Sequence, residues 1–382
     1  MLSRIDHGSI ANWWWTIDRS ILAACLLLMG LGILLSFAAS PAVAQKIGIA
    51  DSFHFVKLHI KYTLPAFFMM IAVSFMAPHN IRRCCLLLLA ITVLLMILTL
   101  FIGIEIKGAR RWISFLGIRI QPSEFMKPAL IITLAWLFSE QKRHHNIIPA
   151  YFMAIVLCIV CAFLLFLEPD IGQTLLVSAT GGALFFLAGV SWAVILLFFT
   201  LIIVGSIGAY VALDHVRERI KGFLTGDGNT FQVDVGREAI INGGWFGQGP
   251  GEGTVKRIIP DAHTDFIFSV AAEEYGIILC MLIVLLFAFI VIRSLFIATK
   301  EHEQFTCFSI AGIAMLFGCQ SIVNIAVNLH LMPPKGMTLP FISYGGSSLF
   351  AVALTIGSLL AFTRKRPEAR MSASLSSMTA IV

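Results

Sequence analysis

The chain alternates between long apolar runs and polar connecting segments, and ten of the runs are candidates for membrane helices. These runs lie at about 21–39, 57–77, 85–104, 124–139, 147–167, 171–189, 191–212, 266–297, 305–327 and 341–362. A helix of about 20 predominantly apolar residues crosses the hydrocarbon core of a bilayer. The pattern therefore predicts an all-α, polytopic integral membrane protein with about ten transmembrane helices and one large extracytoplasmic loop at 213–264.

Composition supports this class of protein. Hydrophobic residues make up 58% of the 382 residues and charged residues only 13%, whereas a soluble domain carries about 25% charged residues. The net charge of +6 is modest and lies largely near membrane boundaries, so it indicates topology and contact with anionic lipids rather than nucleic-acid binding. The eight cysteines lie in or beside apolar segments and predict neither a disulfide nor a metal site.

Basic residues set the predicted orientation in the membrane. An even number of crossings places both termini on one side of the membrane. Arg and Lys gather in the connecting segments on that side, as is typical of cytoplasmic loops. The first apolar run is longer than the core of a signal peptide, so we expect it to remain as a helix. We expect a cytoplasmic segment at 1–20, a membrane domain at 21–363 and a disordered cytoplasmic tail at 364–382.

One short loop, at 105–120, breaks the charge rule. It faces outward on this topology, yet against a single acid, Glu105, it carries four basic residues. The four are Lys107, Arg110, Arg111 and Arg119. Guanidinium groups suit phosphate and pyrophosphate, so the loop predicts an anionic ligand on the outer side. The alternative is that one helix is miscounted and the loop is cytoplasmic.

The polar segment 213–264 is rich in glycine, with six glycines between residues 243 and 253. Glycines at this density let the backbone approach another group closely or turn sharply. The segment is therefore interpreted as a loop that covers a ligand, with a plain connector as the alternative.

Asp265 stands where this polar segment enters an apolar run. An ionisable residue at the mouth of a membrane segment is costly, and it suggests a functional site. Asp265 could act as a general base at the outer membrane surface, or it could only cap the following helix. The neighbouring His263 is a second candidate for a base or a hydrogen-bond donor.

The fourth apolar run opens with polar residues of its own. Ser123 is a candidate N-cap, and Glu124 and Lys127 share a helix face and can form an ion pair. An ion pair inside the membrane marks either a functional site or an architectural salt bridge. Both roles remain open from the sequence.

Further acids and amides fall near the same predicted outer surface. Glu168 and Asp170 flank a proline in a very short turn, where they could hold Arg or Lys side chains or a divalent cation. At least one of Glu273 and Glu274 must face protein or water rather than lipid. The other polar positions in this region are Asn324, Asn328 and His330.

Five ordered motifs resemble those of the SEDS (shape, elongation, division and sporulation) family. They are KGARRWI at 107–113, QPSEFMK at 121–127, EPDIG at 168–172, PDAHTDF at 260–266 and SYGGSS at 343–348. The resemblance spans about 20–365 and is closer to the cell-division member of the family than to its elongation member. One departure is the large loop, where only Phe231-Gln232 matches the glutamine-rich run that the family often carries.

The resemblance implies a ten-helix peptidoglycan glycosyltransferase that polymerises lipid II at the outer face of the bacterial cytoplasmic membrane. It implies that Asp265, the acid of the His-Thr-Asp-Phe motif, is the essential catalytic residue. It also implies substrate-binding roles for Lys107, Arg110, Arg111, Trp112, Arg119, Glu124, Lys127, Asp170, Gln232, His263, Thr264 and Ser343. The implied partners are a class B penicillin-binding transpeptidase and other divisome membrane proteins, and the implied location is the division septum.

The mechanism expected from this resemblance is an inverting transfer. Asp265 would take the proton of the acceptor 4-hydroxyl, and the basic loop would stabilise the leaving polyprenyl pyrophosphate, with a divalent cation such as Mg or Mn left open. No protein-held metal site is predicted. Two other classes of function remain: a flippase for lipid-linked sugars and a non-catalytic division scaffold.

Overall fold

The computed structural model describes residues 8–106, 109–115, 118–143, 150–212, 217, 231–333 and 336–365. The first helices are α1 (Ser9–Thr16), α2 (Arg19–Ile47), α3 (His54–Ser74) and α4 (Pro78–Ile102). Strands β1 (Ile104–Ile106), β2 (Ala109–Phe115) and β3 (Ile118–Ile120) follow. The remaining elements are α5 (Pro122–Arg143), α6 (Ala150–Leu167), α7 (Ile171–Ala188), α8 (Trp192–Ala212), α10 (Phe231–Gly243), η1 (Val255–Arg257), α11 (Ile267–Ala298), α12 (Gln304–Asn328) and α13 (Gly346–Phe362).

Each of the ten predicted apolar runs contains a helix, so the all-α membrane class is confirmed. Within the described residues, seven helices are long and apolar enough to cross a membrane, and α8 and α13 contain shorter apolar helices. Helix α5 is less apolar because it carries Glu124 and Lys127, and it packs against α4, α6, α7, α12 and α13. An ionisable pair on a helix with so many neighbours is shielded from lipid by protein.

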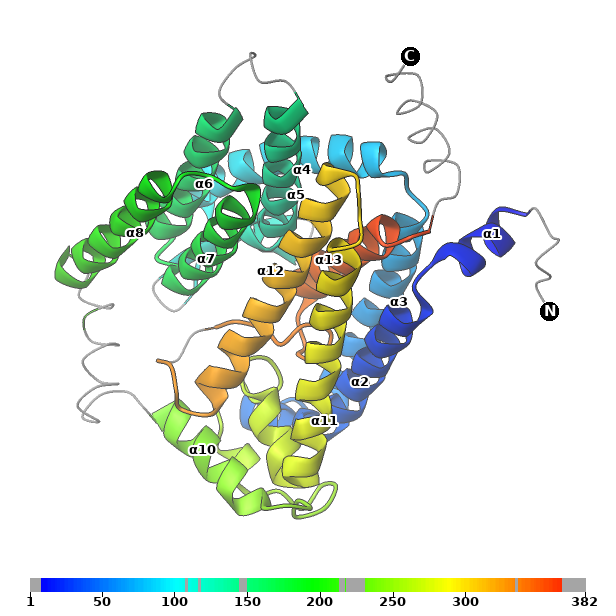
Figure 1. The fold of residues 1–382 in the computed structure, drawn as a ribbon. Coiled ribbons are helices and arrows are strands. Elements are labelled where there is room, and N and C mark those ends of the chain that lie inside the picture. Colours follow the sequence, from blue (N-terminus) through cyan, green and yellow to red (C-terminus); the bar gives the residue numbers. More distant parts are fainter. Residues whose placement is uncertain are drawn as a thin grey trace, which may run out of the picture.

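The end of α2, the segment before α11 and the segment before α13 meet at one end of the bundle. Lys46 at the end of α2 donates to the Ile258 carbonyl, and Tyr344 before α13 donates its N–H to the His263 carbonyl. We call this the α10 end, which lies at the bottom of Figure 1. At the opposite end, Lys365 donates its N–H to the Thr16 carbonyl.

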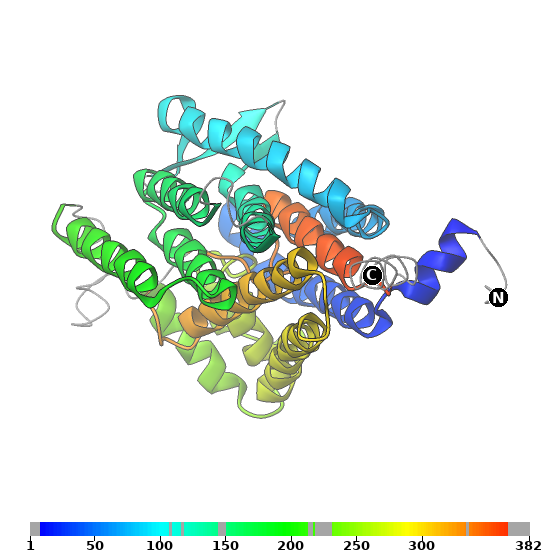
Figure 2. The same cartoon turned by 45° about the horizontal axis from the view of Figure 1, so that its top comes forward.

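Two helices lie apart from the centre of the bundle. Figure 2 shows α8 along one edge and α1 projecting on the opposite side. Helix α1 is fixed to the bundle by Trp13, whose indole donates to Ser74 Oγ at 2.8 Å and stacks on Phe75. The tryptophan cluster thus anchors a separate short helix ahead of the first long one, which begins at its N-cap Asp18.

The sequence pattern missed the structure inside the basic loop. Residues 104–120 contain a three-stranded antiparallel sheet in the order β1-β2-β3, with Glu105 opposite Arg110 and Ser114 opposite Arg119. Alternating apolar and polar positions at 104–106 and 118–120 carried the signal for these short strands. This small sheet is an addition that the sequence pattern did not predict within an otherwise helical structure.

The glycine-rich segment packs into helix α11. Gly276 interrupts this helix with φ 77° and ψ −178°. The carbonyls of Glu273 and Glu274 there accept hydrogen bonds from the N–H groups of Gln248 and Gly249 instead of from their own helix. In return, the Ile277 N–H donates to the Gly244 carbonyl at 3.0 Å.

The glycines of this segment are therefore needed for contact with a helix backbone. A Cβ at Gly243 would clash with the Ala272 carbonyl, and one at Gly247 would clash with the Glu274 carbonyl. Neither alternative drawn from the sequence, a ligand cover or a plain connector, included this packing. Covering of a ligand by the segment stays a prediction.

An ion pair fixes the same segment to α11. Lys256 pairs with Glu274, and Glu273 accepts hydrogen bonds from the N–H groups of Val255 and Lys256 at 2.7 and 2.8 Å. Both glutamates are buried, with 0% and 1% of their surface exposed. The prediction that these acids face protein rather than lipid is confirmed.

Candidate functional site

Asp265 lies at the α10 end, in the turn that leads into α11. The residue is half-buried, and its N–H donates to the Asp261 carbonyl at 3.1 Å. The N-cap position of α11 belongs to Phe266, so Asp265 lies one residue too early for the simple capping role. Its role as a general base stays a prediction.

His263 is packed in an aromatic cluster two residues before Asp265. Its ring lies 4.5 Å from the ring of Phe55 and stacks on Tyr344 at 5.3 Å between centroids. Burial lowers the pKa of His263 to about 4, so the ring is neutral near pH 7. The ring is also buried, with 9% of the residue exposed, whereas Asp265 is half-buried, so accessibility favours Asp265 over His263 as the candidate base.

Thr264 and Ser343 have structural bonds within their own turns. Thr264 Oγ1 donates to the Asp261 carbonyl at 3.1 Å, and Ser343 Oγ accepts from the Leu339 N–H at 2.8 Å. Ser343 is buried with 1% exposed. The structure thus gives Ser343 a role in shaping the 339–343 turn, and the substrate contact expected for it finds no support in this geometry.

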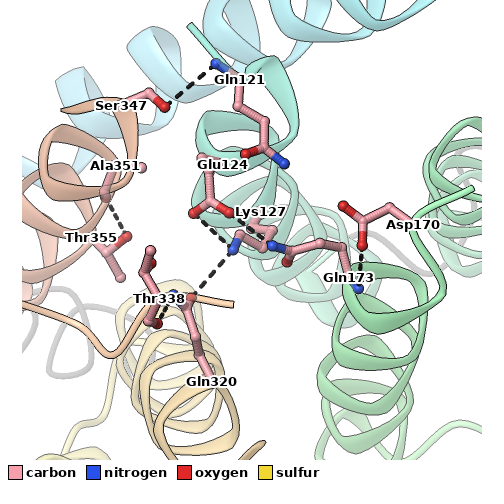
Figure 3. Close-up of polar contacts among 10 residues, drawn as sticks. All are labelled: Gln121, Glu124, Lys127, Asp170, Gln173, Gln320, Thr338, Ser347, Ala351 and Thr355. Carbon is pink, nitrogen blue, oxygen red and sulfur yellow. Dashed lines mark hydrogen bonds and ion pairs between the residues drawn. The ribbon is translucent and has the colours of Figure 1, made fainter. Parts of the chain in front are cut away.

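Glu124 and Lys127 form the buried ion pair that the sequence predicts. Lys127 Nζ lies 3.0 Å from Glu124 Oε2 and donates to Gln320 Oε1 at 3.3 Å, while Gln173 Nε2 donates to Glu124 Oε1 at 2.8 Å (Figure 3). The pair therefore joins α5 to α7 and α12. A small pocket beside it is lined by both members of the pair and by Gln320 and Thr355.

One expectation for this helix is wrong. Helix α5 begins at Pro122, so Ser123 lies inside the first turn and is not the N-cap. Proline is favoured at the first helical position because it has no N–H that would be left without a partner. With Ser123 as the N-cap the helix would begin at residue 124, so the observed start at Pro122 lies two residues earlier.

Arg111 connects strand β2 to the turn between α6 and α7. Its guanidinium lies 3.4 Å from Asp170 Oδ2 and donates to the carbonyls of Glu168 and Pro169. Asp170 also caps α7 by accepting from the Gln173 N–H. The prediction that an acid of this turn holds a basic side chain is confirmed for Asp170, whereas the carboxyl of Glu168 accepts a hydrogen bond from Thr99. Arg111 is turned toward its own protein.

The other loop residues lie on the sheet or beyond the described part. Arg110 and Arg119 are exposed, and Arg110 Nε lies 3.6 Å from Glu105. Trp112 is half-buried in β2, opposite Ile104, and Lys107 lies outside the described residues. The two exposed arginines are thus the described basic groups of this loop that can reach an anionic ligand.

Gln232 lies half-exposed in the first turn of α10, which packs against α11. Of the predicted disordered tail at 364–382, residues 366–382 lie outside the described residues, whereas Arg364 and Lys365 bond to Thr16.

A protein-held metal site does not fit these residues. Among the side chains that the structure describes, no group of three or more His, Cys, Asp or Glu could hold a metal ion. The two acids of the 168–170 turn already engage Arg111 and Thr99.

Two residues of the polar network around Glu124 and Lys127 were not predicted from the sequence. Gln173 and Gln320 each bond to one member of the buried ion pair, although they lie 49 and 193 residues from their partners in sequence. Their signal was a glutamine within an apolar run, where an amide needs a partner. The sequence does not say which partner that is.

The buried carboxyl of Glu168 should make the stability of the folded protein depend on pH. Burial raises the pKa of Glu168 to about 7, from an ordinary value near 4.5. Between these values the folded protein keeps a proton that the unfolded chain has released, so rising pH favours unfolding. Glu168→Gln should flatten the fall of Tm between pH 5 and 8 and stabilise the protein at pH 8 by roughly 1–3 kcal/mol.

The check is thermal unfolding in detergent across this pH range. Glu252→Gln, at an exposed carboxylate, is the control and should follow the wild-type curve. An unchanged pH profile in Glu168→Gln would show that this carboxyl does not set the dependence.

Comparison with known proteins identifies the family. Residues 18–368 match the model of the FtsW/RodA/SpoVE family, described as cell cycle proteins. The chain belongs to this family. The match covers more than nine tenths of the 382 residues and includes every candidate residue named above. The family resemblance seen in the motifs is therefore confirmed.

Individual relatives support the same assignment. A protein of Caulobacter vibrioides named probable peptidoglycan glycosyltransferase FtsW is 46% identical over 96% of this chain and 94% of its own length. A protein of Pseudomonas fluorescens with the same name is 33% identical, over 90% and 87%. Both relatives bear the name of the division member of the family, toward which the motifs also pointed.

Solved structures share the fold. A chain from a peptidoglycan synthase complex superposes with a TM-score of 0.74 at 24% identity, covering 91% of this chain and 97% of that chain. The rod shape determining protein RodA of Thermus thermophilus superposes with a TM-score of 0.68 at 25% identity, covering 92% and 97%. The arrangement of helices is therefore that of known family structures.

Proposed function

We propose that this protein is a peptidoglycan glycosyltransferase that joins lipid II units into glycan strands at the outer face of the bacterial cytoplasmic membrane. The observation that carries the proposal is the 46% identity, along nearly the whole chain, to a protein named for this activity. The geometry agrees with it. The sheet that carries the exposed Arg110 and Arg119 packs through β3 against α13, and Tyr344 just before α13 bonds to the turn that holds the half-buried Asp265.

Asp265 is the general base of the proposed reaction. Its carboxylate takes the proton of the acceptor sugar 4-hydroxyl as this oxygen attacks the anomeric carbon of the donor. The carbon–oxygen bond to polyprenyl pyrophosphate breaks, and the configuration at the anomeric carbon inverts. Both substrates are lipid-anchored, so holding them in one bilayer supplies proximity.

Arg110 and Arg119 stabilise the pyrophosphate as its charge develops. Exposed guanidinium groups bind phosphate oxygens through paired N–H donors. Arg111, which the sequence analysis grouped with them, holds the 168–170 turn in place for this sheet.

A pair of arginine variants separates these roles. Arg110→Ala should raise the KM for lipid II about 3- to 10-fold with an unchanged Tm, and the effect should weaken as salt is added. Arg111→Ala should lower the Tm by several degrees, because two carbonyls and Asp170 lose a half-buried partner. Initial rates over lipid II concentration and thermal unfolding measure both. A stable Arg111→Ala protein with a raised KM would reverse the assignment.

The proposed setting is the division septum, with both termini in the cytoplasm. The partners are a class B penicillin-binding transpeptidase and other divisome membrane proteins. Support comes from the two relatives named FtsW and from the basic residues that gather at the helix ends opposite the α10 end.

The decisive experiment is polymerisation in detergent micelles. Purified protein, alone and with a class B transpeptidase, is incubated with lipid II, and glycan is resolved on a gel. Micelles have no second leaflet, so a flippase for lipid-linked sugars would give no product there, and a non-catalytic scaffold would also give none. Glycan strands support the proposal, and their absence under both conditions would contradict it.

A further inference from the structure

The carbonyl of Asp265 is held by two buried side chains of helix α12. Asn324 Nδ2 and Asn328 Nδ2 each donate to the Asp265 carbonyl oxygen at 3.0 Å. The two asparagines are 2% and 0% exposed. Residues four apart lie on one face of a helix, so the two amides reach the same oxygen from successive turns.

Asn328 takes the place of one backbone bond of helix α11. In a continuous helix the Ser269 N–H would donate to the Asp265 carbonyl, four residues earlier. Here the Ser269 N–H donates to Asn328 Oδ1 at 3.1 Å, while Asn328 Nδ2 donates to that carbonyl. The carboxamide is inserted between the two groups, and it supplies the cap that Phe266 lacks.

Asn324 connects the same carbonyl to the segment before α13. Its Nδ2 also donates to the Met337 carbonyl. The neighbouring Gly336 passes close to the reactive group, since a Cβ at this glycine would lie 3.4 Å from Asp265 Oδ2. One buried amide thus sets the distance between two chain segments that border the carboxylate.

We propose that Asn324 and Asn328 are positioning residues for Asp265. They hold its carbonyl so that the residue stays out of the helix and its carboxylate keeps one orientation beside Gly336. Neither amide touches substrate. This role rests on the proposed function, because the orientation matters only if Asp265 accepts a proton in the reaction.

The test uses aspartate at each position. Asn328→Asp keeps the acceptor for Ser269 and the side-chain shape but loses both N–H donors, and Asn324→Asp loses its donors to Asp265 and Met337. Each change should lower kcat for glycan formation roughly 10- to 100-fold, the scale expected for a misplaced catalytic group, with KM for lipid II within about twofold of wild type.

Ser321→Ala is the matched control, because Ser321 lies on the same face of α12 as Asn324 and Asn328. Its hydroxyl is buried and donates within α12 to the Phe317 carbonyl. This variant should keep the wild-type kcat, with at most a small loss of Tm. If aspartate at either position lowers the yield of folded protein, Asn324→Ala and Asn328→Ala replace these variants with the same expected results.

A second readout distinguishes positioning from general destabilisation. In an Asp265→Asn background, adding Asn328→Asp should cause no further loss of residual activity, because the group that it positions is already gone. An additive loss would overturn the proposal, as would a wild-type kcat in both aspartate variants. Wild-type protein that makes no glycan would instead contradict the proposed function.

Discussion

Asp265→Asn should reduce glycan formation about 10²- to 10⁴-fold, which is the range for loss of a general base. The amide has nearly the shape of the carboxylate, so the turn at 261–266 and the bonds to the Asp265 carbonyl should be retained. The loss should therefore fall on kcat rather than on KM or Tm. The measurement is the initial rate of lipid II polymerisation by purified protein.

The control for this change is Asp51→Asn. Asp51 is a partly exposed carboxylate next to α3, where it pairs with Lys57 at 2.7 Å. A surface pair of this kind contributes about 0–1 kcal/mol, so the control should polymerise at the wild-type rate. Glycan formation at a normal rate by Asp265→Asn would exclude this residue as the base.

Lys127→Met should be the most destabilising single change in the polar network. Lys127 and Glu124 have 2% and 6% of their side chains exposed, so removing the ammonium leaves a buried carboxylate without its counter-charge. Breaking a buried pair in this way costs about 3–5 kcal/mol. The expected result is a marked loss of Tm in detergent and a lower yield of folded protein.

The double variant Glu124→Gln with Lys127→Met decides between the two roles that the sequence left open. It removes both charges while Gln173 can still bond to an amide at position 124. Most of the lost stability should return, because the double variant buries no unpaired charge. Wild-type polymerisation in the double variant would make the pair architectural, and a low kcat at restored Tm would make it functional.

The helices and the candidate motifs were predictable because their signals are local. A run of apolar residues marks a membrane helix by its length, and Glu124 and Lys127 fall on one face by their spacing. The short strands at 104–120 and helix α10 were missed. Their apolar residues are too few to stand out beside the membrane runs.

The partners of each polar group were predictable only where they are close in sequence. Arg111 was expected at a pyrophosphate, but it binds the carbonyl of Glu168, 57 residues later. The contact of Gln320 with Lys127 spans 193 residues. Such bonds follow from the packing of whole helices, which no local pattern contains.

The exchange of backbone bonds at Gly276 limits how the protein can admit its substrates. The polypeptide at 244–249 cannot lift off without unwinding α11 at the same point, because each completes the bonding of the other. This part of the α10 end therefore behaves as a fixed wall, with no hinge of its own. An entrance for the two bulky lipid-borne sugars of the proposed reaction has to open along another side of the molecule.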